Sequence, residues 1–399
     1  MKILLVLIVF VGSGVWATPN NSTKNLHPAT GLSFVDFVKY FGYPIEVYEN
    51  IQTEDGYLLT MHRIPHGKNN ADQPKKGVVL LVHCLTCSAT IYTMYGPEKG
   101  LAFILADQGY DVWMPNARGT EFSRKHISMN PDDKTGAFWR FSWHEIAYYD
   151  LPASIEVVKE NTGVEKMMYV GFSQGTTTFT VLAATRPEYN DLFSLSVLLA
   201  PGTYFANIKN SFLLLLAKHL DPLMELVKDI MWFEFLPNYH LFDALAVFCN
   251  GFGQEFCTEF FLTFLGVSPD QLEQSWLPVF ATFIPSGCSA NQLIHYGQLI
   301  VSKKFQQYDY GLEENLAEYG TPTPPEYDVS KITTPVAIFY GANDEIITDD
   351  VENFAADLPN LIHLQLVDDP MFNHIDFILN ANVIELVYND VLALMSKYV

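Results

Sequence analysis

The sequence predicts an α/β fold with a mostly parallel sheet. Short apolar segments alternate with helical patterns along the first half of the chain, which is typical of parallel strands joined by crossover helices. A glycine-flanked serine, Ser173, directly follows one apolar segment, and an aromatic-rich segment begins after residue 200. The alternating strand and helix segments are expected, in chain order, at 77–83, 102–107, 110–114, 149–159, 167–172 and 194–200.

The turns between these segments agree with the alternation. Asn161-Thr162-Gly163 ends the helix before the strand at 167–172, because glycine readily takes the left-handed conformation that closes a helix. Arg186-Pro187 ends the helix that follows this strand, since proline cannot continue a helix. Pro201-Gly202 then marks the point where the alternation of strands stops.

Gly171-Phe172-Ser173-Gln174-Gly175 is a G-x-S-x-G motif between an apolar run and a helical pattern. In this motif the glycines relieve crowding at a sharp strand-to-helix turn, and the next helix directs its first amides at a developing oxyanion. Ser173 is therefore a candidate nucleophile for attack on a carbonyl group.

Two later segments supply candidate partners for Ser173. The buried-strand pattern at 336–341 leads into Asp344, and His374 opens a later apolar segment. The order serine, aspartate, histidine is that of an α/β-hydrolase. In this arrangement His374 takes the proton of Ser173, while Asp344 orients the imidazole and stabilises its charged form.

Other residues are alternatives for the two supporting roles. Asp349 or Asp350 is the alternative acid, if Asp344 is only a turn residue, and His363 is the alternative base. His363 lies in an alternating, strand-like run, which favours a place on a sheet face over a catalytic loop. Asp376 is expected to support the segment that carries His374.

Length and composition fit one hydrolase core with an insertion. The chain has 399 residues, 49% hydrophobic and 14% aromatic, which allows a large core and exceeds one minimal domain. The 45 acidic and 23 basic residues give a formal net charge of -22, which argues against nucleic acid as a partner. We interpret this acidity as a solvated, self-repelling surface, with adaptation to acidic surroundings as the alternative.

The expected organisation is a leader, a core in two parts and an insertion. Residues 1–17 have the basic start, apolar stretch and small-residue cleavage site of an export signal, with an uncleaved membrane anchor as the alternative. Residues 18–200 and 326–399 are expected to form the hydrolase core, and 201–325 a helical cap or lid. A cap with an apolar inner face would form a pocket for an apolar substrate and exclude water from the reaction.

The leader implies a secretory route, and the expected location is extracellular, with the lysosome as the alternative. No later segment reaches the roughly 20 apolar residues that a transmembrane helix needs. Asn20 and Asn21 begin two overlapping N-glycosylation sequons, a weak signal because both lie close to the expected cleavage site.

Five cysteines leave at least one thiol unpaired if the others form bridges within the chain. Cys249 and Cys257 are the predicted disulfide, because this bridge would close a short loop in the aromatic insertion, and two buried thiols are the alternative. Cys84-Leu85-Thr86-Cys87 has C-x-x-C spacing, but no second cysteine pair or suitable histidine follows. We therefore expect neither metal nor redox chemistry at this motif.

Nine further short segments of the sequence match motifs of one known protein family. They are Tyr40-Phe41-Gly42-Tyr43-Pro44, 53–59, His62-Arg63-Ile64-Pro65, 109–113, Asn116-Ala117-Arg118-Gly119, Phe138-Trp139, 149–153, His295-Tyr296-Gly297-Gln298 and Tyr308-Asp309-Tyr310-Gly311. With the Ser173 motif, these segments resemble the acid lipase family, which includes lysosomal acid lipase and gastric lipase. The resemblance covers nearly all of the chain after the leader.

The resemblance implies a hydrolase core with a lid, acting on acylglycerols or sterol esters at a lipid–water interface without a cofactor or metal. By motif, Ser173, Asp344 and His374 take the catalytic places. The backbone amides of Leu85 and Gln174 take the oxyanion-hole places. Cys249 and Cys257 also fall near the cap disulfide of the family.

Two departures from the family pattern lie close to this chemistry. Relatives usually have His-Gly-Leu-Leu where this chain has His83-Cys84-Leu85-Thr86, so Cys84 adds a Cβ where glycine permits close approach and positive φ. A displaced Leu85 amide would reduce activity without abolishing it, which leaves a weakened or inactive lipid carrier as the alternative function. Hydrolysis of small soluble esters is a further alternative. Phe172, where relatives commonly have histidine, is expected to be a packing residue.

Overall fold

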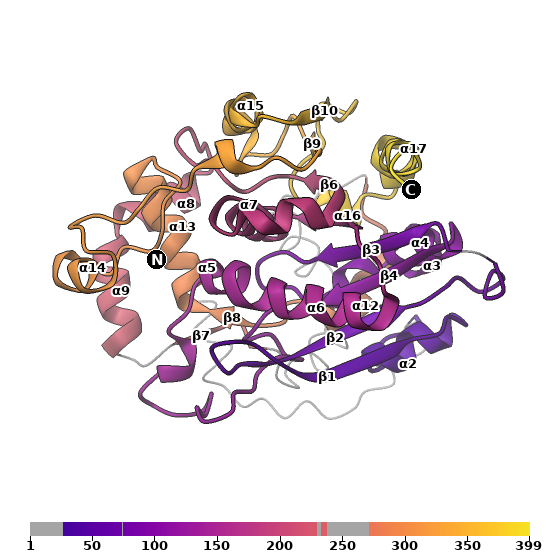
Figure 1. Cartoon of the computed structure of the whole chain (residues 1–399), viewed down its shortest axis with the longest axis horizontal. Helices are drawn as coiled ribbons and strands as arrows, with labels where there is room; N and C mark the ends of the chain where they lie inside the picture. Colours follow the sequence, from indigo (N-terminus) through magenta and orange to yellow (C-terminus); the bar gives the residue numbers. More distant parts are fainter. Residues whose placement is uncertain (1–26, 74, 230–232, 238–270) are drawn as a thin grey trace.

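The computed structural model describes residues 27–73, 75–229, 233–237 and 271–399 (Figure 1). An eight-stranded sheet with surrounding helices forms its centre, which confirms the predicted α/β class. The strands are β1 (Glu46–Gln52), β2 (Leu58–Ile64), β3 (Gly77–Val82), β4 (Tyr110–Pro115), β5 (Met167–Phe172), β6 (Phe193–Leu199), β9 (Val336–Tyr340) and β10 (Leu361–Leu366).

The strand order in the sheet is β1-β2-β4-β3-β5-β6-β9-β10, from the bottom of the view in Figure 1 to the top. The pairs β1–β2 and β2–β4 are antiparallel, and every pair from β4 to β10 is parallel. Because β3, β5 and β6 run side by side in one direction, their carboxyl ends meet at one edge of the sheet.

The three helices predicted in the first half of the sequence are present, with small shifts at their ends: α4 (Leu101–Asp107), α6 (Leu151–Thr162) and α7 (Gln174–Thr185). Three further helices were not predicted: α2 (Phe34–Tyr40), α3 (Gly96–Lys99) and α5 (Trp143–Glu145). Gly163 closes α6 with a φ of 69°, as the turn motif predicts. A π-helical turn at Ile146–Asp150 precedes α6, so the regular helix begins later than the sequence pattern indicates.

The segment between β6 and β9 is mainly helical in its described part. Its helices are α8 (Ser211–Lys218), α9 (Leu220–Asp229), α12 (Leu277–Phe283), α13 (Ala290–Ser302) and α14 (Leu312–Glu318). Between Leu199 and Val336, no described residue joins the large sheet, and β7 (Glu234–Phe235) pairs only with β8 (Cys288–Ser289). The chain then ends with α15 (Thr348–Asp357), α16 (Asp376–Leu379) and α17 (Asn389–Met395).

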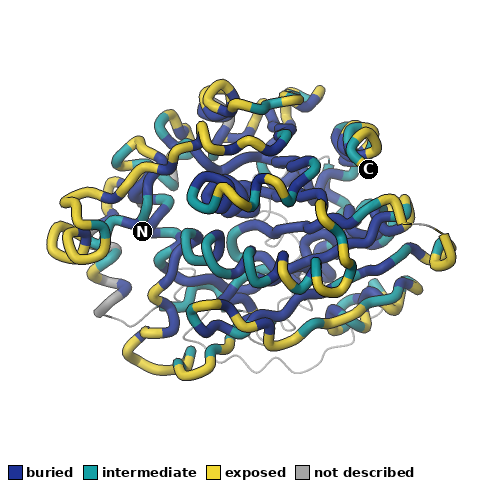
Figure 2. The backbone as a smooth tube through the Cα atoms, in the orientation of Figure 1, coloured by how far each residue is buried: buried dark blue, intermediate teal, exposed yellow. Residues whose placement is uncertain are grey.

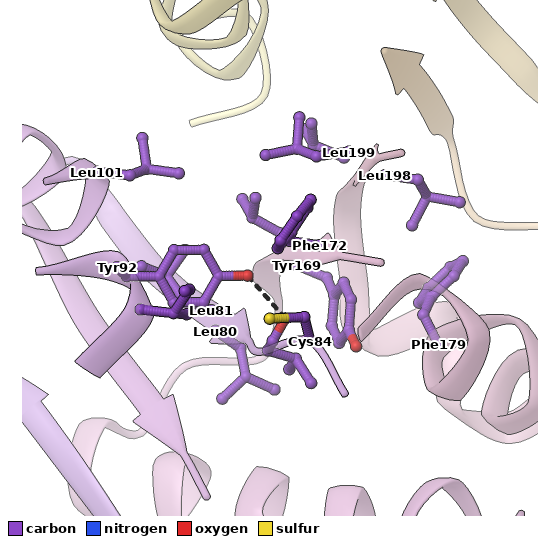
Figure 3. Close-up of a cluster of buried hydrophobic side chains, with 14 of the residues drawn as sticks. Leu80, Leu81, Cys84, Tyr92, Leu101, Tyr169, Phe172, Phe179, Leu198 and Leu199 are labelled. Atoms are coloured by element: carbon purple, nitrogen blue, oxygen red, sulfur yellow. Dashed lines mark hydrogen bonds between the residues drawn. The ribbon is translucent and has the colours of Figure 1, made fainter. Parts of the chain in front are cut away.

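The core lies around the central parallel strands, which appear dark blue in Figure 2. Every residue of β5 is buried, as expected for a strand covered on both faces. Figure 3 shows part of this core, where Cys84, Leu80, Leu81 and Tyr92 gather near Phe172. The Tyr92 hydroxyl donates a 2.7 Å hydrogen bond to the carbonyl at the end of β3, so this polar group is satisfied inside the core.

Several sequence-based predictions fall outside the described residues: the leader at 1–17, the sequons at Asn20 and Asn21, and the Cys249–Cys257 disulfide. Within the described ranges, no helix has both the length and the apolar character that crossing a bilayer requires.

Candidate active site

Ser173 lies in a sharp turn between the end of β5 and the start of α7. Its φ of 53° and ψ of -115° are unusual for a residue with a side chain, and such strain is often found at functional sites. A Cβ at Gly175 would lie 2.1 Å from the Val82 carbonyl oxygen, and one at Gly171 would lie 2.7 Å from the Gly175 backbone. Both glycines are therefore required by the close approach of α7 to β3 and β5.

Ser173, His374 and Asp344 form a continuous hydrogen-bonded chain. His374 Nε2 lies 2.7 Å from Ser173 Oγ, and His374 Nδ1 lies 2.7 Å from Asp344 Oδ2. A carboxylate accepts hydrogen bonds, so Nδ1 carries the proton and Nε2 is left to accept one from the serine hydroxyl. This arrangement suits a serine whose proton must be removed as its oxygen attacks.

Loops at the carboxyl ends of the parallel strands hold the two partners of Ser173. Asp344 follows β9 and is buried, and its second oxygen accepts a 3.0 Å hydrogen bond from the Ile346 backbone. The Asn343 amide donates to the Phe372 carbonyl at 3.0 Å, which ties this loop to the one that carries His374. As expected, Asp376 supports the His374 loop by accepting a 2.9 Å hydrogen bond from the Asn373 amide.

The alternative partners have other contacts. Asp350 accepts two 2.8 Å hydrogen bonds from Asn207, one from its backbone and one from its side chain. His363 lies on β10, as its alternating pattern predicts, and its Nε2 is 2.9 Å from Gln365 Oε1. The side chain of Asp349 is outside the described part of the chain. Ser173, Asp344 and His374 are therefore the set that the fold brings together.

The two predicted oxyanion donors lie at the ends of neighbouring strands. Gln174 is the first residue of α7, where a backbone amide has no helical acceptor. Leu85 follows β3, whose last residue, Val82, pairs with Gly171 of β5. No described residue accepts a hydrogen bond from either amide. The positive φ suggested at Cys84 is instead found at Thr86, where φ is 60°.

Cys84 and Cys87 form a disulfide, with their Cα atoms 5.3 Å apart. Their C-x-x-C spacing was tested above only against metal and redox chemistry, so this structural bridge was not predicted. The signal was present, because cysteines at the first and last positions of a four-residue turn lie within bridging distance. Cys288 is a free, buried cysteine.

His83 links the Cys84 loop to the segment after β4. The Ala117 amide donates to His83 Nε2 at 3.0 Å, so the ring proton is on Nδ1, which donates to the Cys84 carbonyl at 2.8 Å. Ala117 is itself held in place, since the next residue, Arg118, is fully buried and paired with acidic side chains. Burial lowers the pKa of His83 to about 4, because the charged ring would lose its hydration.

The lowered pKa of His83 predicts acid sensitivity. The unfolded imidazole binds a proton near pH 6.5 while the folded one stays neutral to about pH 4, so this residue's stabilising contribution is lost as pH falls through that range. The stability advantage of wild type over His83→Gln should shrink by up to about 3 kcal/mol between pH 6.5 and pH 4. Denaturant unfolding of both proteins at several pH values measures this difference, and two parallel stability curves would contradict it.

Two further contacts near Ser173 were not found from the sequence. The Gln174 side chain donates to Gln292 on α13 at 2.7 Å, and the Thr177 and Tyr296 hydroxyls are 3.0 Å apart. Both join the insertion to the start of α7, and sequence periodicity carries no signal for such polar pairs. Phe172 is fully buried with its ring 5.4 Å from the His374 ring, in agreement with the packing role expected for it.

Known proteins resemble this chain in sequence along most of its length. A family model described as alpha/beta hydrolase fold matches residues 77–381, and one described as a partial alpha/beta-hydrolase lipase region matches residues 34–96. Lipase member K of Homo sapiens is 35% identical over 383 residues, which span 94% of this chain and 93% of the relative. Gastric triacylglycerol lipase of Rattus norvegicus is 37% identical over 378 residues, 93% of each chain.

Solved structures share the fold at low sequence identity. A putative lipase from Sulfolobus solfataricus aligns with a TM-score of 0.59 at 15% identity, covering 88% of this chain and 94% of its own. A soluble variant of monoglyceride lipase from Saccharomyces cerevisiae aligns with a TM-score of 0.52 at 17% identity, covering 88% and 96%. These structures establish the fold alone. The sequence matches establish the family and confirm the resemblance: the chain belongs to the lipases of the α/β-hydrolase family.

Proposed function

We propose that the protein hydrolyses neutral lipid esters, such as acylglycerols or sterol esters, through an acyl-enzyme on Ser173. The observation that carries this proposal is the chain of two 2.7 Å hydrogen bonds from Ser173 through His374 to Asp344. It occurs in a sequence that is 37% identical to a gastric triacylglycerol lipase. The proposed mechanism requires no metal or cofactor.

In the first half of the reaction, Ser173 Oγ attacks the ester carbonyl as its proton moves to His374 Nε2. The carbonyl oxygen becomes an oxyanion, which the backbone amides of Leu85 and Gln174 stabilise. The C–O bond to the alcohol then breaks, and the alcohol leaves with the proton held by His374. The acyl group remains on Ser173.

In the second half, His374 removes a proton from a water molecule that attacks the acyl-enzyme. The same two amides stabilise the second oxyanion, and the proton returns to Ser173 as the fatty acid leaves. Throughout the cycle the carboxylate of Asp344 fixes the ring of His374 and stabilises its charged form.

We further propose that residues 201–325 act as a cap over this site, between core parts at 18–200 and 326–399. The contacts of Gln292 and Tyr296 with the start of α7 support this role, because they attach the insertion next to the nucleophile. Figure 1 shows the helices α8, α9, α13 and α14 gathered on one side of the sheet. A cover there would exclude water and hold an acyl chain.

The leader at residues 1–17 supports an exported protein, and we propose an extracellular location, with the lysosome as the alternative. A lipid-carrier function is not favoured, because the relatives are named lipases and the three proposed catalytic residues are hydrogen-bonded in a productive order.

The test of the proposed function is fatty acid release by the purified, secreted chain from emulsified trioleoylglycerol and from a short-chain ester, between pH 4 and 8. We expect release from both substrates, with the emulsion preferred. Hydrolysis of the soluble ester without release of fatty acid from the emulsion would indicate an esterase of small substrates. A folded protein that is inert on both substrates would favour the lipid-carrier alternative.

A further inference from the structure

We propose that the Cys84–Cys87 disulfide holds the Leu85 amide in position for oxyanion binding. The inference rests on the proposed function, because it assigns a positioning role beside the same site. Cys84 and Cys87 flank Leu85 and Thr86, so the bridge closes a ring around the residue whose amide is the proposed donor.

The bridged segment is a tight turn with one strained position. The Cys87 amide donates to the Cys84 carbonyl at 3.2 Å, which is the hydrogen bond of a β-turn with Leu85 and Thr86 in its centre. Thr86 occupies the third turn position with a φ of 60°, where glycine is usual and a β-branched residue is unfavourable. Without another constraint, relief of this positive φ would rotate the peptide group between Leu85 and Thr86 and loosen the turn that carries the Leu85 amide.

Two hydrogen bonds from outside the turn hold carbonyl groups of the bridged segment. His83 donates to the Cys84 carbonyl, and the Thr86 carbonyl accepts a 2.7 Å hydrogen bond from the Ser286 amide. No described residue accepts from the Leu85 amide, which shares one planar peptide group with the Cys84 carbonyl, so the hydrogen bonds to that carbonyl also aim this amide. The covalent link between the two ends of the turn adds to these hydrogen bonds and keeps the turn closed.

The burial of the sulfurs favours a positioning role over thiol chemistry. Cys84 and Cys87 are 5% and 6% exposed, and Cys84 lies within the core cluster beside Leu80, Leu81 and Tyr92 (Figure 3). Thiol–disulfide exchange needs a sulfur that a thiolate can reach, which these are not in the folded protein. The proposal therefore includes no electron transfer during turnover.

The first measurement is peptide mapping of the secreted, full-length protein after alkylation without reduction. We expect the peptide that contains Cys84 and Cys87 to stay unalkylated and to gain two alkyl groups only after reduction. Alkylation of both residues in the unreduced, denatured protein would show that the bridge is absent and would overturn the inference without reference to activity.

The second measurement compares kcat, KM and Tm for wild type and Cys84→Ser/Cys87→Ser on a soluble ester. A misdirected donor weakens the transition state more than substrate binding, so kcat should fall about 10- to 100-fold with KM changed less than about threefold. Cys288→Ser is the matched control, since it replaces a buried cysteine outside the turn and should leave kcat within about twofold of wild type.

Thr86→Gly supplies a rescue in the bridge-free background. Glycine accepts the positive φ that threonine resists. The kcat of the triple variant should therefore be at least about tenfold higher than that of the bridge-free variant. The rescue also keeps the test informative if the bridge-free variant has a lower Tm. If the disulfide had only a structural role, Thr86→Gly would restore Tm without restoring kcat.

The outcomes separate this inference from the proposed function. Wild-type kcat retained in the bridge-free variant would overturn the positioning role while leaving the lipase mechanism in place. Loss of kcat without rescue by Thr86→Gly would also count against it. If folded wild type hydrolyses no ester, the proposed function fails first, and the positioning role fails with it.

Discussion

Replacing Ser173 by alanine is expected to lower kcat on ester substrates by at least about 10⁴-fold, with the fold retained. The substitution removes the oxygen that is proposed to attack the carbonyl while leaving His374 and Asp344 paired. Ser173 is half-buried in the turn, and among the described residues its Oγ is hydrogen-bonded to His374 alone, so its removal creates no large cavity. Fatty acid release and Tm, measured on the same preparations, check both parts of this expectation.

Ser196→Ala is the matched control for Ser173→Ala. Ser196 is fully buried on β6, next to β5, and its hydroxyl has no hydrogen-bond partner in the described part of the chain. Its removal should therefore change neither kcat nor Tm appreciably. If Ser173→Ala retained wild-type turnover while the control behaved as expected, another nucleophile would have to be sought and the acyl-enzyme on Ser173 abandoned.

The parts of the fold that could be predicted from the sequence are those whose signal is local. The strand at 167–172 is buried on both faces, so it appears as a continuous apolar run, and the strand at 194–200 is apolar apart from two serines. The nucleophile turn carries its own signature, because close backbone approach at Gly171 and Gly175 permits no larger residue. Asp344 and His374 were found through their order in the chain and their place after apolar segments.

The parts that could not be predicted depend on contacts between distant segments or on exposed elements. Most residues of β1 are exposed or half-buried, so this strand shows no apolar run. Gln292 meets Gln174 across 118 positions of sequence, and neither residue type indicates a partner by itself. At Cys84 and Cys87 the spacing allowed a bridge, but the turn that it needs was not indicated, because its positive φ falls on a threonine, a residue that sequence rules do not place there.

Asp344→Asn is expected to lower kcat by about 10³- to 10⁴-fold with little change in KM. Asparagine is nearly the same size as aspartate, but its amide can donate to His374 Nδ1 and so favours the tautomer with the proton on Nε2. That nitrogen can then no longer accept the proton of Ser173, and the charged ring formed in the transition state loses its carboxylate. Steady-state kinetics on a soluble ester, with Tm as a check on folding, measure the effect.

Asp350→Asn distinguishes this role from the mere loss of a buried carboxylate. Asp350 is 3% exposed and binds the backbone and side-chain nitrogens of Asn207, so its replacement exchanges an acceptor for a donor and should lower Tm. It makes no contact with His374 among the described residues, so kcat should stay within about threefold of wild type. A collapse of kcat in Asp350→Asn with turnover preserved in Asp344→Asn would reverse the assignment. In that case the 2.7 Å contact between Asp344 and His374 would serve the structure of the loops rather than the transfer of the serine proton.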